Sequence, residues 1–142
     1  MKKQYQRVAG RVSQDGRGQV EKKVRIKAGK VEALAQLNDS AIAGLVWDAL
    51  PISASVNTWG DEIYFEIPVK SGLEKPQDVV NLGDIGYWPS GRCFCIFFGP
   101  TPVSSKGEIR PASSVEIIGK VLTGPLEFKK VRAGDKILLE KA

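Results

Sequence analysis

The chain has 142 residues, of which 42% are hydrophobic and 26% are charged, a balance typical of a single globular domain. Histidine is absent, which excludes Ser-His-Asp triads, Cys-His pairs and imidazole metal ligands, so acid–base chemistry would fall to Asp, Glu, Lys, Tyr or Cys. The net charge of +5 comes from residues 1–23, which hold seven basic and two acidic side chains. We expect no cofactor and no bound metal.

The basic N-terminus is polar and glycine-dotted, and it shows no sustained hydrophobic period. Residues 1–22 are therefore predicted to be a flexible extension that precedes one domain at residues 23–142. Because an electrostatic footprint for phosphate should lie on a folded face, nucleic acid is not an expected partner. No run approaches the ~20 apolar residues that span a bilayer, and no signal peptide is recognisable, so we expect a cytoplasmic protein without a membrane partner.

The first predicted elements are a hairpin and a helix. Apolar and polar residues alternate through residues 23–37, around a turn at Ala28-Gly29-Lys30, and this pattern predicts a β-hairpin. Asp39 and Ser40 offer an N-cap for a following helix, which Pro51 ends. We expect this helix to plug one open end of a sheet or barrel with its apolar face.

The stretch from Ser55 to Pro68 (SVNTWGDEIYFEIP) is the first of two aromatic segments. Residues 59–62 are predicted to form a tight turn before a strand at residues 63–67, whose odd-numbered positions make one apolar face. Asp61 and Glu62 are interpreted as turn residues rather than as a catalytic carboxylate pair.

The second aromatic segment, Leu82 to Pro102, predicts two strands joined by a turn at residues 89–91, after a short helical turn at residues 77–80. Residues 93–98 are apolar on both faces, so this strand must be covered on both sides. Cys93 and Cys95 share one face of it with α-carbons about 6.6 Å apart, a poor geometry for a disulfide. Two buried, reduced thiols are expected.

The remaining segments complete an all-β pattern. An exposed loop at residues 99–112 precedes a strand at 115–122, a short helix at 126–131 and a last strand at 136–140. The fold class predicted is mainly β: a closed or nearly closed antiparallel β-barrel of about eight strands with one or two short helices. Closure accounts for this count because it leaves no exposed sheet edge.

The two aromatic segments together hold eight of the eleven aromatic residues. Trp59 and Trp88 occur at turns, where full burial is awkward, and polar groups able to fix a ligand lie near them. We therefore expect a pocket for a small-molecule or peptide ligand, apolar or proline-containing. The alternative is a structural or protein-interaction module in which every aromatic side chain belongs to the core. The candidate ligand-binding residues are Asn57, Trp59, Tyr64, Trp88, Phe98 and Thr101.

Three runs, SVNTWGDEIYFEIP, GDIGYWPSGRCFCIFFGPTP and EIRPAS, resemble in this order a small bacterial and archaeal family of unknown function with a cyclophilin-like β-barrel. The resemblance covers about Lys23 to Glu140 and implies that fold. Cyclophilins isomerise the bond before proline with a donor arginine in a Phe-His-Arg run, which this chain lacks. The resemblance thus leaves a divergent or weak peptidyl-prolyl isomerase as a further alternative, with Arg92 and Arg110 as candidate catalytic residues. The oligomeric state stays open.

Overall fold

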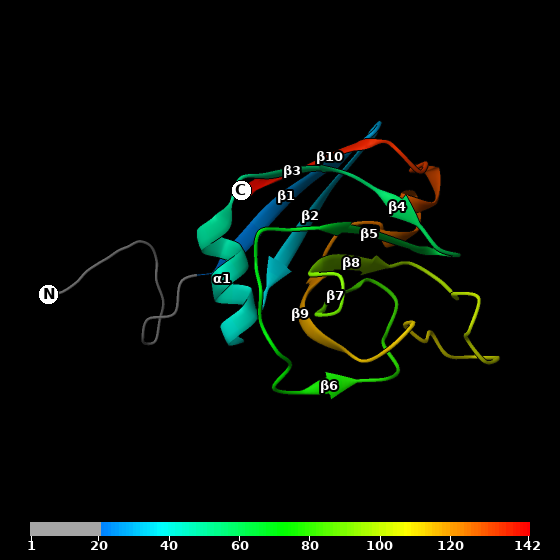
Figure 1. Ribbon diagram of the computed structural model, residues 1–142. Helices are drawn as coiled ribbons and strands as arrows, with labels where there is room; N and C mark the ends of the chain where they lie inside the picture. The colour runs from blue at the N-terminus through cyan, green and yellow to red at the C-terminus, as the bar shows by residue number, and fades with distance from the viewer. Residues whose placement is uncertain (1–20) are drawn as a thin grey trace, which may run out of the picture.

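A computed structural model describes residues 21–142 of the chain. One antiparallel sheet of ten strands curls into a nearly closed barrel, and the fold class is therefore mainly β, as predicted (Figure 1). Residues 1–20, most of the predicted basic extension, lie outside the described residues. Strand β1 already begins at Lys22, one residue before the expected start of the domain, and the division into extension and domain stays a prediction.

The sheet runs in the order β3-β10-β1-β2-β9-β7-β8-β5-β4, with β6 paired to β9 outside this path. Two strands more than expected are present because β4 and β6 contain only two residues each. The strands are β1 Lys22–Ala28, β2 Val31–Leu37, β3 Ile52–Ser55, β4 Asn57–Thr58, β5 Glu62–Glu66, β6 Pro76–Gln77, β7 Asp84–Trp88, β8 Cys93–Phe97, β9 Val115–Val121 and β10 Lys136–Lys141.

The N-terminal hairpin and the helix form as the sequence predicts. Ala28 and Val31 are the last paired residues before the turn between β1 and β2. Helix α1 (Ala41–Ala49) begins at Ser40, whose hydroxyl accepts a hydrogen bond from the Ala43 amide at 3.2 Å, and this bond satisfies a donor that the helix itself leaves free. The buried face of α1 packs into the barrel core.

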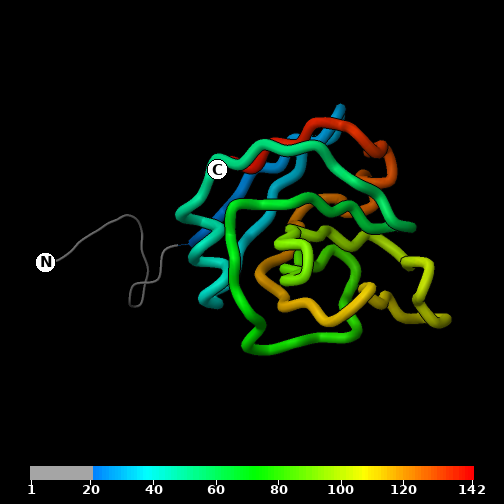
Figure 2. Tube along the Cα trace, viewed as in Figure 1, coloured from blue at the N-terminus to red at the C-terminus, as the bar shows by residue number. Residues whose placement is uncertain are grey.

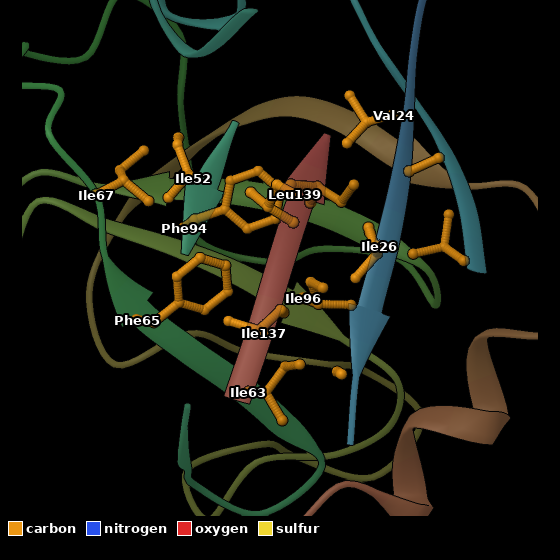
Figure 3. Packing of buried hydrophobic residues seen from close by; sticks show 14 of the residues in the cluster. Val24, Ile26, Ile52, Ile63, Phe65, Ile67, Phe94, Ile96, Ile137 and Leu139 are labelled. Atoms are coloured by element: carbon orange, nitrogen blue, oxygen red, sulfur yellow. The ribbon is translucent and has the colours of Figure 1, made fainter. Parts of the chain in front are cut away.

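The interior of the barrel is filled by alternate residues from almost every strand. The rings of Phe65 on β5 and Phe94 on β8 stack with their centroids 5.3 Å apart. Figure 3 shows Ile63, Ile96 and Ile137 gathered beside these rings. All five side chains are almost fully buried, so the inner face is a dry core rather than a channel.

The barrel closes through one bent segment of chain. The two ends of the sheet, β3 and β4, are consecutive in sequence and meet at Val56. The Val56 amide donates to the Asp135 carbonyl at 3.0 Å, and the Val56 carbonyl accepts from the Gly134 amide at 2.9 Å. Before this bend the chain pairs with β10, and after it with β5, which leaves a single unsealed seam.

One local prediction is wrong, and a second is confirmed with a change of helix type. The expected helical turn at residues 77–80 is wrong, because β6 pairs with β9 there and Val80 bridges to Ile109, so sheet partners rather than a helix satisfy this backbone. The short helix expected at residues 126–131 is a 3-10 helix, η1 (Pro125–Lys130). Within residues 21–142, neither helix is long and apolar enough to cross a membrane.

Candidate functional site

The outer face of β5 and β8 carries a second apolar cluster, separate from the barrel core. Tyr64 lies directly opposite Cys95, and Glu62 lies opposite Phe97, so these side chains share the face that points away from Phe65. The sequence prediction that β8 must be covered on both sides is confirmed, since all its residues are buried. The buried members of the outer cluster are Val80, Cys93, Cys95, Phe97 and Val115.

The outer cluster is covered in part by the long segment 99–114 between β8 and β9, drawn in yellow on the side away from α1 (Figure 2). A compact hydrogen-bond network fixes its base. The Ser104 hydroxyl oxygen accepts from the amides of Thr101 and Arg110, both at 2.9 Å. The Thr101 hydroxyl donates in turn to the Arg110 carbonyl. These hydrogen bonds fix the conformation of the loop, because they join its two arms at Ser104.

The turn before β5 is clamped to the start of this loop. The Asp61 amide donates to the Pro100 carbonyl at 3.0 Å, and the Phe98 amide donates to the Asp61 carbonyl at 2.9 Å. Gly60 has a φ of +60°, and a Cβ at this position would lie 2.9 Å from the Thr101 α-carbon. Only glycine fits this close approach, so the turn and the loop are held as one unit.

A cavity of about 290 Å³ opens where turn, loop and outer sheet face meet, and we call it the tryptophan cavity. Its three aromatic side chains are half-buried. The Trp88 ring is held in place by a hydrogen bond of 2.6 Å from its Nε1 to the Ser113 hydroxyl. The lining residues are Trp59, Glu62, Tyr64, Trp88, Cys95, Pro111, Ala112 and Val115.

Glu62 supplies a carboxyl group to the lining of the tryptophan cavity, although only 6% of this residue is exposed. Burial raises the pKa of its carboxyl to about 7, and the hydrogen bond from the Cys95 thiol offsets this only in part. Burial also raises the pKa of Cys95 well above its ordinary value, so this thiol stays protonated at neutral pH. Glu62 can therefore either accept or donate a proton near neutral pH.

The structure brings together three of the six residues that the sequence suggests for ligand binding: Trp59, Tyr64 and Trp88. Asn57 is exposed on β4 and donates to the Tyr64 carbonyl at 3.4 Å. The other two do not line the cavity. Phe98 shares the parity of Phe94 and points into the barrel core, and Thr101 belongs to the hydrogen-bonded base of the loop.

Neither candidate catalytic arginine lines the tryptophan cavity. Arg92 lies exposed in the turn between β7 and β8, with a φ of +53°. The Arg110 guanidinium forms an ion pair with Glu108 at 2.8 Å, although Pro111, the next residue, does face the cavity. The contact between an arginine and a pocket-bound proline ring that the isomerase alternative requires is therefore not preformed.

Glu62 is the principal residue that sequence reasoning missed. The sequence places it in a turn, but it is the first residue of β5, and its partner across the sheet, Phe97, explains its burial. Its even spacing from Tyr64 would have revealed the shared face. Cys95, Pro111, Ala112 and Val115 were likewise missed as lining residues, because loop closure over the sheet has no local sequence signal.

Within the part of the chain that the structure describes, no three acidic or cysteine side chains gather in a way that could hold a metal ion. The two cysteines are free and buried, as predicted.

Solved structures with a similar fold include two that differ in their sequence identity to this chain. One is the solution structure of the hypothetical protein AF2241 from Archaeoglobus fulgidus, with 38% identity and a TM-score of 0.75 over 90% of this chain and 100% of that chain. The other is McbB in complex with tryptophan, with 12% identity and a TM-score of 0.64 over 83% of this chain and 44% of that chain. The second likeness extends to the fold alone.

No curated protein matches the sequence. Residues 22–140 match the model of a family described as cyclophilin-like, in agreement with the barrel topology and with the archaeal structure. The chain therefore belongs to the cyclophilin-like family, as its sequence motifs indicate.

Proposed function

We propose that this protein binds a small, largely apolar ligand, such as a proline-containing peptide or a compound with an aromatic ring, in the tryptophan cavity. The observation that carries the proposal is the buried Glu62 carboxyl at a cavity whose other walls include two tryptophan rings. Small-molecule sites are commonly built in this way, with apolar and aromatic walls and a few polar groups that fix orientation.

The energetics favour a small occupant. The cavity, at about 290 Å³, lies at the lower end of the range of roughly 300–1,000 Å³ that is usual for ligand pockets. Each Å² of apolar surface removed from water contributes about 25 cal/mol, so a single ring between Trp59 and Trp88 would gain a few kcal/mol. A cavity whose aromatic walls are already fixed loses little of this gain to side-chain ordering.

The positions of Trp59 and Trp88 support a ligand-binding cavity rather than a structural module in which both rings only fill the core. Trp88 is anchored through Ser113, and Trp59 is carried by a turn that is clamped to the loop. In the alternative of a structural module, these rings would fill the space between turn, sheet and loop. Instead they are half-buried and leave a cavity beside them.

The experiment is a titration of ¹⁵N-labelled protein with three separate probes: indole, N-acetylprolinamide and L-tryptophan. Tryptophan is included because McbB, which shares the fold, was solved in complex with it. We expect at least one probe to shift the indole N–H signals of Trp59 and Trp88. The signal of Trp47 on α1 serves as an internal control and should stay in place, because Trp47 does not line the cavity.

Trp59→Ala should weaken binding of the active probe about tenfold or more, since it removes one wall of the site. Trp47→Ala is the matched control and should leave the affinity unchanged. The proposal fails if none of the three probes shifts the two cavity signals at millimolar concentration, or if binding survives Trp59→Ala unchanged.

A further inference from the structure

The tryptophan cavity has a distinct electrostatic character. Three aromatic side chains and one carboxyl line it, and none of its lining residues among the described part of the chain is a lysine or arginine. The faces of aromatic rings carry partial negative charge, so they attract cations. The carboxylate form of Glu62 adds a full negative charge at the same place.

We propose that the ligand of the tryptophan cavity is an organic cation, an amine or quaternary ammonium with apolar substituents, whose charge is held by the Glu62 carboxylate and by the rings of Trp59 and Trp88. This inference rests on the proposed function and specifies its ligand class. Aromatic cages recognise alkylated ammonium groups in this way, because the methyl groups contact the rings while the charge interacts with their faces.

The burial of Glu62 is the second argument. An isolated charged carboxylate in a water-poor site is unfavourable, and Glu62 is 94% removed from solvent with a protonated thiol as its hydrogen-bond partner. A bound cation would supply the missing opposite charge. An anionic ligand would instead place two negative charges together, and a neutral ligand would leave the carboxyl without compensation.

No other titratable group that faces Glu62 supplies the positive charge that would offset its carboxylate. On its own strand β5 the neighbour on the same face is the Tyr64 phenol, and from β8 it is the Cys95 thiol. The lining residues supplied by β7, the loop and β9 are Trp88, Pro111, Ala112 and Val115, which do not titrate. Cys93, also on β8, has a pKa raised first by burial and then by the nearby Glu66 and Glu62 carboxylates, so its thiol is neutral near pH 7 and adds no charge.

The test compares choline with its neutral isostere 3,3-dimethylbutan-1-ol by NMR titration of the full chain. Both have the same shape, so the difference in their affinities reports the charge alone. We expect choline to bind at least about tenfold more tightly than the isostere at about pH 8, with shifts at the indole signals of Trp59 and Trp88. With the carboxyl pKa at about 7, choline affinity should fall about tenfold between about pH 8 and about pH 6, while that of the isostere stays constant.

Glu62→Gln keeps the size of the side chain and removes its charge. It should abolish the pH dependence of choline binding and reduce the preference for choline to the part that the aromatic rings supply. Glu66→Gln is the matched control, because Glu66 ends the same strand on the same face but is exposed and does not line the cavity. The pH profile of the unmodified protein provides the same information if Glu62→Gln fails to fold.

Three results would overturn the inference. Equal binding of the isostere at the cavity signals would exclude the cationic class while supporting the proposed site. Absence of choline binding in a protein that binds indole or N-acetylprolinamide there would do the same. Choline shifts confined to other parts of the protein would exclude the tryptophan cavity as the cation site.

Discussion

The two faces of β5 and β8 have opposite designs, although the same ten residues supply both. On the inner face, Phe65 and Phe94 stack within a fully packed core. On the outer face, Glu62, Tyr64 and Cys95 adjoin a cavity under a loop. Because strand residues alternate, one short pair of strands can fill the barrel core with one set of side chains and line a largely apolar cavity with the other.

Because the two faces differ in packing, different residues should determine the stability of the fold and the affinity for a ligand. Substitutions on the inner face should lower the free energy of unfolding, whereas substitutions of the half-buried cavity rings on the outer side, such as Tyr64, should mainly change the affinity for ligand. A close-packed interior has no room to relax, but a wall that is already half exposed can lose atoms at little cost. Four predictions test how sharply the two faces are divided.

The largest effect is expected for Phe65→Ala, which removes one of the two stacked rings from the core. The free energy of unfolding should fall by about 3–5 kcal/mol, as for other large-to-small changes of buried aromatic residues. Tyr64→Ala, one residue away on the outer face, should cost only about 1 kcal/mol because Tyr64 is half-buried. Urea unfolding of the two variants measures both values, and equal losses would show that the faces are not divided.

Glu62, although it lies on the outer face, affects stability as well, because its burial links the free energy of unfolding to pH. Its folded pKa of about 7 exceeds the ordinary value of 4.5, so the protonated form is favoured by folding. The contribution of protonated Glu62 to the free energy of unfolding is fully present below about pH 4.5. It is lost as the pH rises through 7, and the loss amounts to about 3 kcal/mol.

Glu62→Gln should remove this dependence. The difference in unfolding free energy between the unmodified protein and the variant is measured by urea unfolding at about pH 4, 6 and 8. It should change by about 3 kcal/mol over this range, in favour of the variant at high pH. A difference that stays constant with pH would contradict the burial of a titrating carboxyl at this position.

Ser104→Ala tests whether the loop is a fixed wall. The variant loses the hydroxyl oxygen that accepts from the Thr101 and Arg110 amides, at an expected cost of about 1–2 kcal/mol. Hydrogen exchange of these two amides should accelerate, and the affinity for the active probe of the titration should fall. Ser105→Ala is the control, since Ser105 is exposed and its side chain has no part in this network.

The smallest effect is expected for Asn57→Ala. Asn57 is exposed, and its side chain makes a single long hydrogen bond to the Tyr64 carbonyl. Stability should change by less than about 0.5 kcal/mol, and probe affinity should stay the same. A clear loss of affinity in the same titration would move the site toward β4 and restore Asn57 as a ligand-binding residue.

Most of the fold could be predicted from local patterns. Three predicted elements each have a physical signature within a few residues: the alternating residues 23–37, the capped helix before Pro51, and the strand at residues 93–98 that is apolar on both faces. The strand count and the need to leave no exposed edge then predicted a closed or nearly closed barrel, and the family motifs implied the same fold; the nearly closed barrel of the structure confirms this. The helical turn predicted at residues 77–80 failed, because its backbone partners lie more than 25 residues away in the sequence.

The candidate site was less accessible from the sequence. The position of two tryptophans at turns drew attention to Trp59 and Trp88, which the structure places at one cavity. Phe98 was predicted to bind ligand because it ends a strand next to the loop, but it has the same parity along the strand as Phe94, so its side chain faces the core. Glu62 was assigned to a turn because a glycine and an aspartate precede it, whereas it is the first residue of β5. Whether a loop returns over a sheet is decided by contacts such as that of Ser104 with Arg110 and Thr101, which no periodicity encodes.

The hydrogen-bonded base of the loop has an evolutionary consequence. The atoms that join its two arms are backbone groups and the hydroxyls of Thr101 and Ser104, whereas Pro111 and Ala112, which face the cavity, supply none of these bonds. Mutations at Ala112 can therefore reshape the site without disturbing either the anchor or the barrel. If the proposed ligand binds in this cavity, such an arrangement would let a lineage change its ligand preference in small steps while each intermediate protein still folds.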